Sequence, residues 1–185
     1  MIIGDTEKKL IEQASAGSEK AWQTLIKRYE SMLFNHALRM VGDPDDARDL
    51  LQDVLLSVYR NLNSFRGEAP FRAWLFRIAT FRCTDHLRRK RFEQAEFEET
   101  EHTAADHNPS LSLENVRSND EIQKLLQRLP PDQRHVVELK FFQHFTFEEI
   151  SRQLGISSNT AKTRLYSALR LLRKSNAAKV ALGNH

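Results

Sequence analysis

The chain has 185 residues, of which 40% are hydrophobic and 29% are charged, and its formal net charge is +3. This balance is typical of a soluble globular protein with one domain or two small ones. No stretch of the sequence is apolar enough to span a membrane, and the charged N-terminus is unlike a signal peptide. The lone cysteine, Cys83, excludes an intramolecular disulfide and favours a reducing compartment, so we expect a cytoplasmic protein.

The first part of the chain predicts helices. Apolar residues recur at helical intervals over residues 6–39, and a glycine interruption predicts two helices there, the second capped by Ser18. Asp43 and Pro44 then predict the start of another helix, which we place at residues 45–62.

One side of that third helix is polar and mostly acidic. It carries Asp49, Gln52 and Asp53. Taken alone, these residues fit either solvated surface or a face that docks on another protein.

A loop at residues 61–70 leads into a helix where aromatic rings alternate with arginines. Residues 64–91 hold eight cations against two acids, together with five large rings. Cations that follow phosphates, beside rings that stack on unpaired bases, are what single-strand nucleic-acid binding requires. However, the rings fall on two opposite arcs of the helix, and a helix that is apolar on two sides is more often one buried in a core.

The composition changes abruptly at residues 93–121. Nine acids there face one arginine, and apolar side chains are few. Too little apolar surface is available to offset the entropy of ordering, so we predict an acidic linker that is flexible at least over residues 96–113. It divides the chain into two small helical domains, residues 1–92 and 122–185.

The second domain contains a helix-turn-helix pattern after a predicted helix at residues 132–142. Thr146 and Glu149 form a capping box, Gly155 ends the short helix, and Ser157 or Ser158 caps a longer basic one. The second helix of such a pair enters the major groove of DNA, although an ordinary helical hairpin with a basic face would give the same pattern. The candidate groove residues are Asn159, Thr160, Lys162, Thr163, Arg164, Tyr166, Ser167 and Arg170.

Residues 46–79 and 126–173, with the intervening linker, together resemble the small two-domain extracytoplasmic-function (ECF) sigma factors of bacteria, in the sigma-70 family. The resemblance covers nearly the whole chain and includes the segments DARDLLQDVLLSVYRNLNSFRGEAPFRAWLFRIA and LGISSNTAKTRLYSALRLLR. It implies a subunit that joins core RNA polymerase, directs it to promoters and starts promoter melting without being an enzyme.

The resemblance also implies roles for particular residues. Asp49, Gln52 and Asp53 would dock on the clamp helices of the polymerase's largest subunit, and the groove residues of the second domain would read the −35 element. The residues that would bind the melted −10 strand are Asn63, Phe65, Arg66, Trp74, Arg77, Phe81, Arg82, Arg88 and Arg89. Many members of the family carry Asn where this chain has Phe81, so Phe81 would either stack on a base or pack in the core.

The resemblance implies an anti-sigma factor as antagonist, and a linker that runs through the RNA exit region of the polymerase. The residues show no metal-ligand spacing, phosphate loop or nucleophile motif, so we expect no metal, no cofactor and no catalytic residues. Two other classes of protein remain open: a repressor that uses only the helix-turn-helix, and an adaptor with no DNA role.

Overall fold

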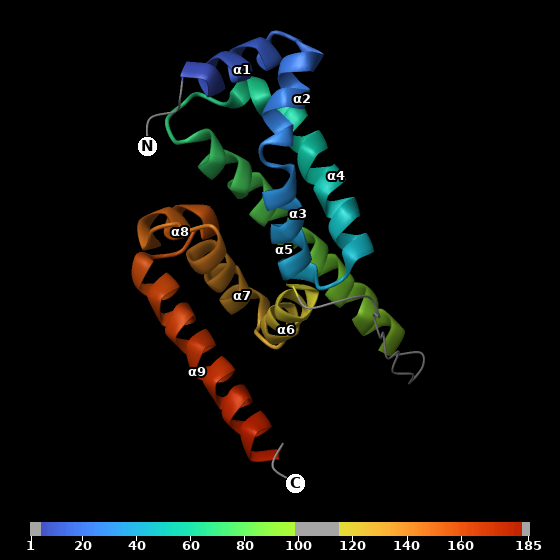
Figure 1. Ribbon diagram of the computed structural model, residues 1–185, viewed down its shortest axis with the longest axis vertical. Coiled ribbons are helices and arrows are strands. Elements are labelled where there is room, and N and C mark those ends of the chain that lie inside the picture. Colours follow the sequence, from blue (N-terminus) through green and yellow to red (C-terminus); the bar gives the residue numbers. More distant parts are fainter. Residues whose placement is uncertain (1–4, 99–114, 183–185) are drawn as a thin grey trace.

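The computed structural model describes the backbone of residues 5–98 and 115–182, and the side chains of residues 6–93 and 121–174. Every regular element in those ranges is a helix, so the predicted all-α fold is confirmed for the described part of the chain (Figure 1). The helices form an N-terminal domain, α1 to α5, and a C-terminal domain, α6 to α9, which lie against each other. The linker predicted to be flexible falls mostly outside the described residues.

The N-terminal domain contains helices of 9 to 28 residues, and side chains cap the start of α2 and α4. Its elements are α1 (Asp5–Ser15), α2 (Glu19–Lys27), α3 (Glu30–Val41), α4 (Pro44–Asn61), the 3₁₀ turn η1 (Leu62–Ser64) and α5 (Phe71–Glu98). Ser18 caps α2 by accepting a hydrogen bond from the Ala21 N–H, as predicted. Asp43 caps α4 in the same way, with Pro44 at its first position.

The prediction of two helices over residues 6–39 is wrong, because the structure has three. The additional break lies at Tyr29, whose buried ring packs edge-on against Phe71 at 5.7 Å. The Tyr29 hydroxyl also donates to Glu7 of α1. These contacts turn the chain inward between α2 and α3, although the apolar periodicity continues through the break.

The C-terminal domain consists of α6 (Asn115–Gln127), α7 (Pro131–Val137), the π-helical turn η2 (Glu138–Phe142), α8 (Phe147–Leu154) and α9 (Ser158–Leu182). The single helix predicted at residues 132–142 is therefore divided. The Gln143 N–H donates to the Glu138 carbonyl at 3.2 Å, the wide bond of a π turn. This turn directs the side chains of Glu138 and Gln143 into the interior, where both are buried.

The predicted helix-turn-helix is confirmed in its local geometry. Thr146 and Glu149 form a capping box at the start of α8, and Gly155 ends that helix in the left-handed conformation, with φ of 64°. The Ser157 hydroxyl accepts from the Thr160 N–H at 3.0 Å, so Ser157 rather than Ser158 caps α9.

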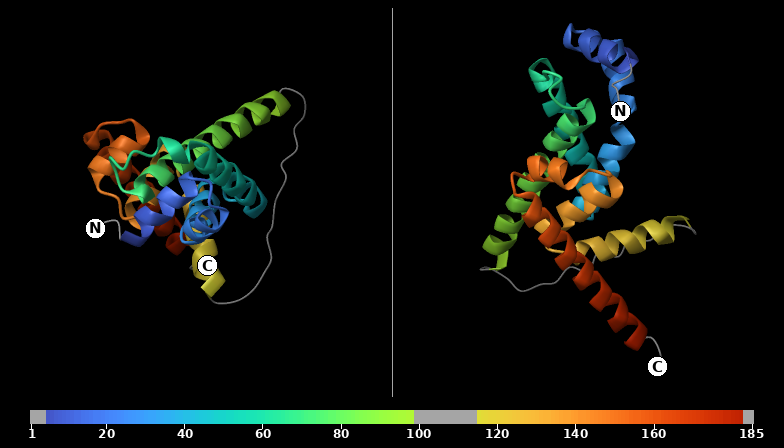
Figure 2. Two further views of the ribbon diagram at one scale, coloured as in Figure 1. Left: turned by 90° about the horizontal axis from the view of Figure 1, so that it is seen from above. Right: turned by 90° about the vertical axis from the view of Figure 1, so that its left-hand side faces the viewer.

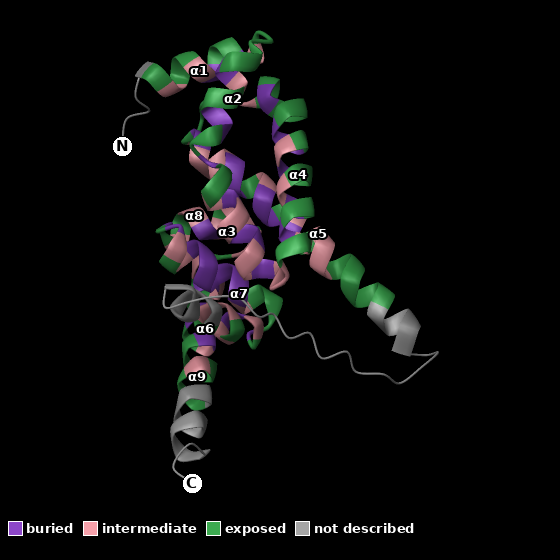
Figure 3. Ribbon diagram, turned by 45° about the vertical axis from the view of Figure 1, so that its right-hand side comes forward, coloured by how far each residue is buried: buried purple, intermediate pink, exposed green. Residues whose placement is uncertain are grey.

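One hydrophobic core runs through both domains. Buried residues from α2, α3, α4 and α5 are continuous with buried residues from α6, α7, α8 and α9. Phe76 of α5, for example, packs edge-on against Phe145 of the C-terminal domain at 6.0 Å. Figure 3 shows the buried residues concentrated where the helices meet, while the distal part of α5 is exposed. The two domains are therefore packed together in a closed arrangement.

The long helices extend beyond this shared core. The distal parts of α5, α6 and α9 project in different directions from it (Figure 2). The backbone of α5 continues to Glu98 and that of α6 begins at Asn115, so helix occupies both ends of the predicted 93–121 linker. Among the described residues, none of the helices combines the length and apolarity that crossing a membrane would require.

Candidate nucleic-acid interface

The two aromatic arcs of α5 have different environments. On one side Phe76 and Cys83 are completely buried. On the opposite side Phe71, in the first turn of the helix, is buried as well and packs against Trp74. Farther along this opposite side the side chain of Trp74 is half-buried and that of Phe81 is 66% exposed. An exposed ring of this size has lost little of its contact with water, so Phe81 does not contribute to the core. The buried arc holds the fold together, and the other arc remains available for a ligand.

Two hollows lie on either side of Trp74 and Arg77. The first, which we call the loop hollow, has a volume of about 190 Å³. It is lined by residues 64–69 of the loop, by Ala73, Trp74 and Arg77 of α5, and by Arg152 and Gln153 of α8. The second, the Phe81 hollow, has a volume of about 390 Å³ and lies between α5 and the end of α4. Its lining includes Ser57, Asn61, Trp74, Arg77, Phe81 and Arg82. Rings and guanidiniums therefore meet in both hollows, as an unpaired base with its phosphate requires.

The hollows bring together most of the residues predicted to bind the melted strand. Phe65 and Arg66 line the loop hollow, and Phe81 and Arg82 line the Phe81 hollow. Arg82 is held in place because its Nε donates to the Ser57 hydroxyl at 2.9 Å.

Three of the predicted residues lie outside both hollows. Asn63 is exposed on η1 but lines neither hollow. Farther along α5, Arg88 and Arg89 are exposed and pair with Asp85 at 2.7 and 3.2 Å. Exposed pairs of this kind contribute little to stability and open readily, so both guanidiniums can be transferred to a phosphate.

Arg72 differs from the other cations of residues 64–91. Its guanidinium donates to the Gln143 carbonyl and to the Gln143 side chain, both at 2.8 Å, and it stacks over Phe76 and Phe145. Burial lowers the pKa of this guanidinium. Arg72 therefore holds the two domains together, and the pattern of charge along the sequence gave no sign of this.

The second basic surface is on α9. Its inner side is formed by Ala161, Leu165 and Ala168, which are buried. All eight predicted groove residues lie on this helix, and five of them are exposed: Asn159, Lys162, Thr163, Tyr166 and Arg170. Thr160, Arg164 and Ser167 are half-buried at the edges of this face.

Local contacts position two of the α9 cations. Arg164 pairs with Asp132 at 2.8 Å, and the Lys162 ammonium lies 5.7 Å from the centre of the Phe147 ring. Because Asp132 is itself exposed, the Arg164 pair is screened by water and can exchange for a phosphate.

The polar face of α4 is also accessible. Asp49, Gln52 and Asp53 are all exposed. The same face continues with Leu56 and Tyr59, which are 47% and 57% exposed and which sequence reasoning missed. Leu56 follows Asp53 by three residues and Tyr59 follows Leu56 by three, and this helical spacing was a signal that could have identified them. Exposed apolar groups beside acids are characteristic of a protein-docking face.

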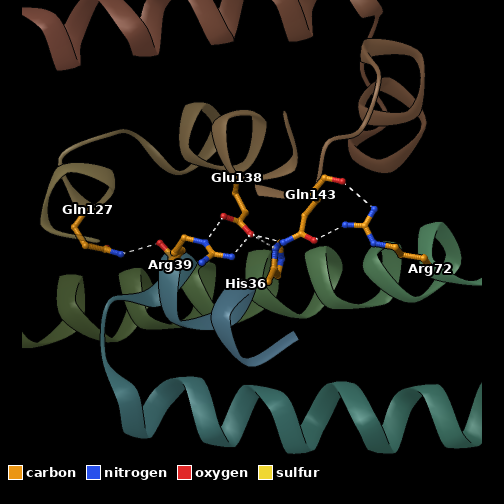
Figure 4. Close-up of polar contacts among 6 residues, drawn as sticks. All are labelled: His36, Arg39, Arg72, Gln127, Glu138 and Gln143. Carbon is orange, nitrogen blue, oxygen red and sulfur yellow. Dashed lines mark hydrogen bonds and ion pairs between the residues drawn. The ribbon is translucent and has the colours of Figure 1, made fainter. Parts of the chain in front are cut away.

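A buried polar cluster joins the two domains, and Figure 4 shows its arrangement. The completely buried carboxylate of Glu138, on η2, accepts hydrogen bonds from the Arg39 Nε at 2.6 Å and from the Gln143 Nε2 at 2.9 Å. His36 Nδ1 lies 3.2 Å from the same carboxylate. Both His36 and Arg39 belong to α3. Sequence reasoning missed this cluster because its members are about 100 residues apart.

The cluster changes the ionisation of three groups. Burial would lower the pKa of His36, but its hydrogen bonds to Cys83 and Glu138 raise it to about 9. Burial would likewise raise the pKa of Glu138, but the cations of His36 and Arg39 lower it. The neighbouring His135 is held neutral because burial, together with the charges of His36 and Arg134, lowers its pKa to about 3.

No group of three or more potential ligands that could hold a metal ion is present among the described residues. Cys83 is free and buried. The arrangement offers rings, guanidiniums and an exposed helix face, which are groups for binding.

Comparisons of the sequence with family models and with known proteins all indicate the same family. The family model for Sigma-70 region 2 matches residues 25–93, and that for Sigma-70 region 4 matches residues 119–172. The chain is 30% identical over 177 residues to the ECF RNA polymerase sigma factor SigW of Bacillus subtilis, which covers 90% of this chain and 95% of the relative. It is 28% identical over 178 residues to the RNA polymerase sigma-H factor of Pseudomonas aeruginosa, which covers 91% of this chain and 92% of the relative.

Solved structures share the fold. CnrH, in complex with the cytosolic domain of CnrY, matches with a TM-score of 0.68 at 24% identity, over 94% of this chain and 99% of that one. The sigma factor RpoE, in complex with the anti-sigma factor NepR from Bartonella quintana, matches with a TM-score of 0.68 at 23% identity, over 84% of this chain and 96% of that one.

Proposed function

This chain belongs to the extracytoplasmic-function sigma factors of the sigma-70 family, and we propose from that premise that it joins core RNA polymerase and reads promoters with two separate surfaces. The observation that carries the proposal is the pairing of an exposed duplex-type surface on α9 with ring-and-arginine hollows around Trp74 and Arg77. A repressor that uses only a helix-turn-helix has no need of such hollows.

The α9 surface suits the −35 element as duplex. Asn159 and Thr163, which are exposed, would reach base edges, and the exposed cations Lys162 and Arg170 would bind phosphates. Arg164 joins them once its exposed pair with Asp132 opens. Tyr166 adds an exposed ring beside the groove.

The hollows around Trp74 suit the −10 element as a melted strand. Phe65, Trp74 and Phe81 supply stacking surfaces, while Arg66 and Arg77 supply exposed cations. Stacking of about 1–3 kcal/mol per base offsets the cost of unpairing, so melting needs binding free energy and no nucleotide hydrolysis. Because Phe81 is exposed and carries no hydrogen-bonding group, it acts by stacking.

The remaining assignments also belong to this proposal. Residues 1–92 act as the polymerase and −10 module, residues 122–185 as the −35 module, and residues 93–121 as the acidic connection. The α4 face of Asp49, Gln52 and Asp53, extended by Leu56 and Tyr59, docks on the clamp helices of the polymerase's largest subunit. The protein acts in the cytoplasm as a binding subunit, with no catalytic residues. An anti-sigma factor restrains it, a proposal supported by the structure of the similar sigma factor RpoE in complex with the anti-sigma factor NepR.

Run-off transcription with purified core polymerase tests the proposal. Over a library of promoter variants, the chain is expected to direct specific transcripts that core polymerase alone does not produce. Transcripts that are independent of the chain would contradict a role as a sigma factor.

A docking variant sharpens this test. Asp49→Arg with Asp53→Arg reverses two exposed charges and should prevent co-elution with core polymerase, since like charges across an interface are costly. The matched control, Glu12→Arg with Glu121→Arg, reverses two exposed charges on other helices and should co-elute normally. Equal co-elution of both variants would show that the α4 face is only solvated surface.

A further inference from the structure

Several polar contacts hold the two domains against each other. Arg39 of α3 donates two hydrogen bonds to Glu138, and Arg72 of α5 donates two to Gln143. Buried Arg134 of α7 donates to the Met40 carbonyl of α3, besides three carbonyls of its own domain. These contacts lie between residues that are distant in sequence, so all of the bonds between domains are lost when the domains separate.

Glu138 is central to the closed arrangement. Its carboxylate is completely buried, and both of its cationic partners, His36 and Arg39, come from the other domain. A buried charge with complementary partners is tolerated, whereas one left without them is strongly destabilising. Replacing Glu138 with a neutral side chain therefore leaves Arg39 facing no anion within a buried interface.

The C-terminal domain contacts one of the two hollows that we assign to the melted strand, the loop hollow, whereas none of its residues lines the Phe81 hollow. The Gln153 Nε2 of α8 donates to the Ala73 carbonyl of α5 at 2.7 Å. Arg152 and Gln153 form one wall of the loop hollow, where the side-chain oxygen of Gln153 has no hydrogen-bond partner. The groove face of α9, by contrast, is not covered.

Closure also prevents simultaneous contact with both promoter elements. Sites centred at −10 and −35 are 25 base pairs apart, which corresponds to about 85 Å at about 3.4 Å per base pair. In the closed arrangement, the helix-turn-helix is in hydrogen-bond contact with the start of α5 through Gln153. Both surfaces can therefore be used on one promoter only after the domains separate.

We propose that the C-terminal domain is an internal inhibitor of the melted-strand surface: it docks on α3 and α5, narrows the loop hollow by forming one of its walls, and is held there by the buried Glu138 cluster. This inference rests on the proposed function for the identity of the contacted surface, but the docking itself does not. Polymerase and promoter binding have to supply the free energy that breaks the cluster.

The test uses the full chain and the substitution Glu138→Gln. Small-angle X-ray scattering measures how compact the chain is, and fluorescence anisotropy measures binding of a labelled single-stranded −10 oligonucleotide. The substitution removes the anion while keeping the shape of the side chain, so the radius of gyration should rise. Affinity for the oligonucleotide should rise about tenfold, because apparent affinity scales with the fraction of molecules in the competent state.

Two further variants make the test specific. Arg39→Gln removes the ion pair from the N-terminal side and should reproduce both effects. Glu148→Gln makes the same carboxylate-to-amide change at an exposed position of α8 and should change neither. Circular dichroism checks that the helices of each variant persist, and if Glu138→Gln does not fold, Arg39→Gln carries the test.

The scattering and binding data test the internal inhibitor and the proposed function separately. Wild-type scattering that already matches separated domains, or unchanged compactness in both cluster variants, would overturn the internal inhibitor. Failure of every variant to bind the oligonucleotide, even with core polymerase present, would overturn the proposed function, while the scattering data still decide whether the cluster holds the domains closed.

Discussion

The surface on α9 and the surface around Trp74 differ in how ready they are to bind. On α9 the candidate groove residues lie on an open face, and even Arg164 is held only by an exposed pair. Around Trp74, the loop hollow is walled by α8, and Arg72 at the start of α5 is bonded to Gln143. The first surface can bind DNA in the closed arrangement, whereas the second is fully available only after the domains separate.

This difference matches the two forms of DNA. A duplex is already present in the promoter, so a surface that reads it gains nothing from being covered. A single strand must first be exposed, and a surface with both ring-and-arginine hollows freely accessible would bind unrelated single strands more tightly than one with the Phe81 hollow alone, because stacking tolerates any sequence. Narrowing the loop hollow until the polymerase is bound would limit such binding.

The largest effect is expected on the α9 surface. Arg164→Ala with Arg170→Ala removes two cations that we place at the duplex, and affinity for a −35 duplex should fall about 100-fold at fixed salt. Binding of a single-stranded −10 oligonucleotide should not change. Fluorescence anisotropy on both ligands checks this.

A matched control is Arg28→Ala with Arg60→Ala, which removes two exposed arginines from the N-terminal domain. If this pair weakens duplex binding as strongly as the α9 pair, binding depends on net charge, and the comparison between the two surfaces fails.

The next effect concerns Phe81. Phe81→Ala should weaken binding of the single-stranded oligonucleotide about tenfold, since loss of stacking on one base costs about 1–3 kcal/mol. Duplex binding by α9 should be unaffected. The control is Phe92→Ala, because Phe92 is an equally exposed ring on the same helix but lines neither hollow. Equal losses in the two variants would remove the basis for placing a base in the Phe81 hollow.

The pH dependence of the free energy of unfolding tests the buried Glu138 cluster, which holds the two domains closed. The pKa of His36 is raised from 6.5 to about 9, so its contribution to the free energy of unfolding is complete below pH 6.5 and is lost as the pH rises toward 9. The pKa of His135 is lowered from 6.5 to about 3, so its protonation in the unfolded chain destabilises the fold as the pH falls from 6.5 toward 3. Glu138, with a lowered pKa, also loses its contribution at acid pH.

The free energy of unfolding should therefore be greatest near pH 6.5. Denaturant titrations across this range measure it. His36→Gln should flatten the alkaline side alone, and His135→Gln the acidic side. A wild-type profile that is level between pH 6.5 and 9 would mean that His36 is not charged inside the closed arrangement.

The smallest effect concerns the capping box of α8. Thr146→Ala removes the side chain that accepts from the Glu149 N–H and should lower the free energy of unfolding by about 1 kcal/mol. Thermal denaturation measures the loss, with Thr163→Ala on the exposed face of α9 as the control. Since the Thr146 side chain is exposed and bonds only within the cap, single-strand affinity should stay the same, and an altered affinity would indicate that α8 is only loosely docked.

The features that the sequence predicts well are local ones. Ser18, Asp43, Thr146 and Gly155 act within a few residues of themselves, and all four were placed correctly. The exposed face of α9 was also predictable. The helix has one apolar arc, and because that arc packs against the core, the opposite side is left in solvent.

The features that could not be predicted depend on partners distant in the chain. Phe76 and Phe81 are the same residue type on the same helix, but Phe76 packs against His36 of α3 and Phe145 of the other domain, whereas Phe81 is 66% exposed. Likewise, the sequence shows Arg72 as one cation in a basic run, while Gln143 makes it an interdomain contact. Periodicity identifies the faces of a helix but does not specify what covers them.

Permanganate footprinting of a promoter tests most directly that this chain opens DNA through the surface around Trp74. With core polymerase and the wild-type chain, unpaired thymines should become reactive around −10, and Phe81→Ala should reduce this reactivity while leaving protection of the −35 element intact. Protection at −35 without any reactivity at −10, in the presence of active core polymerase, would contradict a role in melting and leave only a duplex-binding protein.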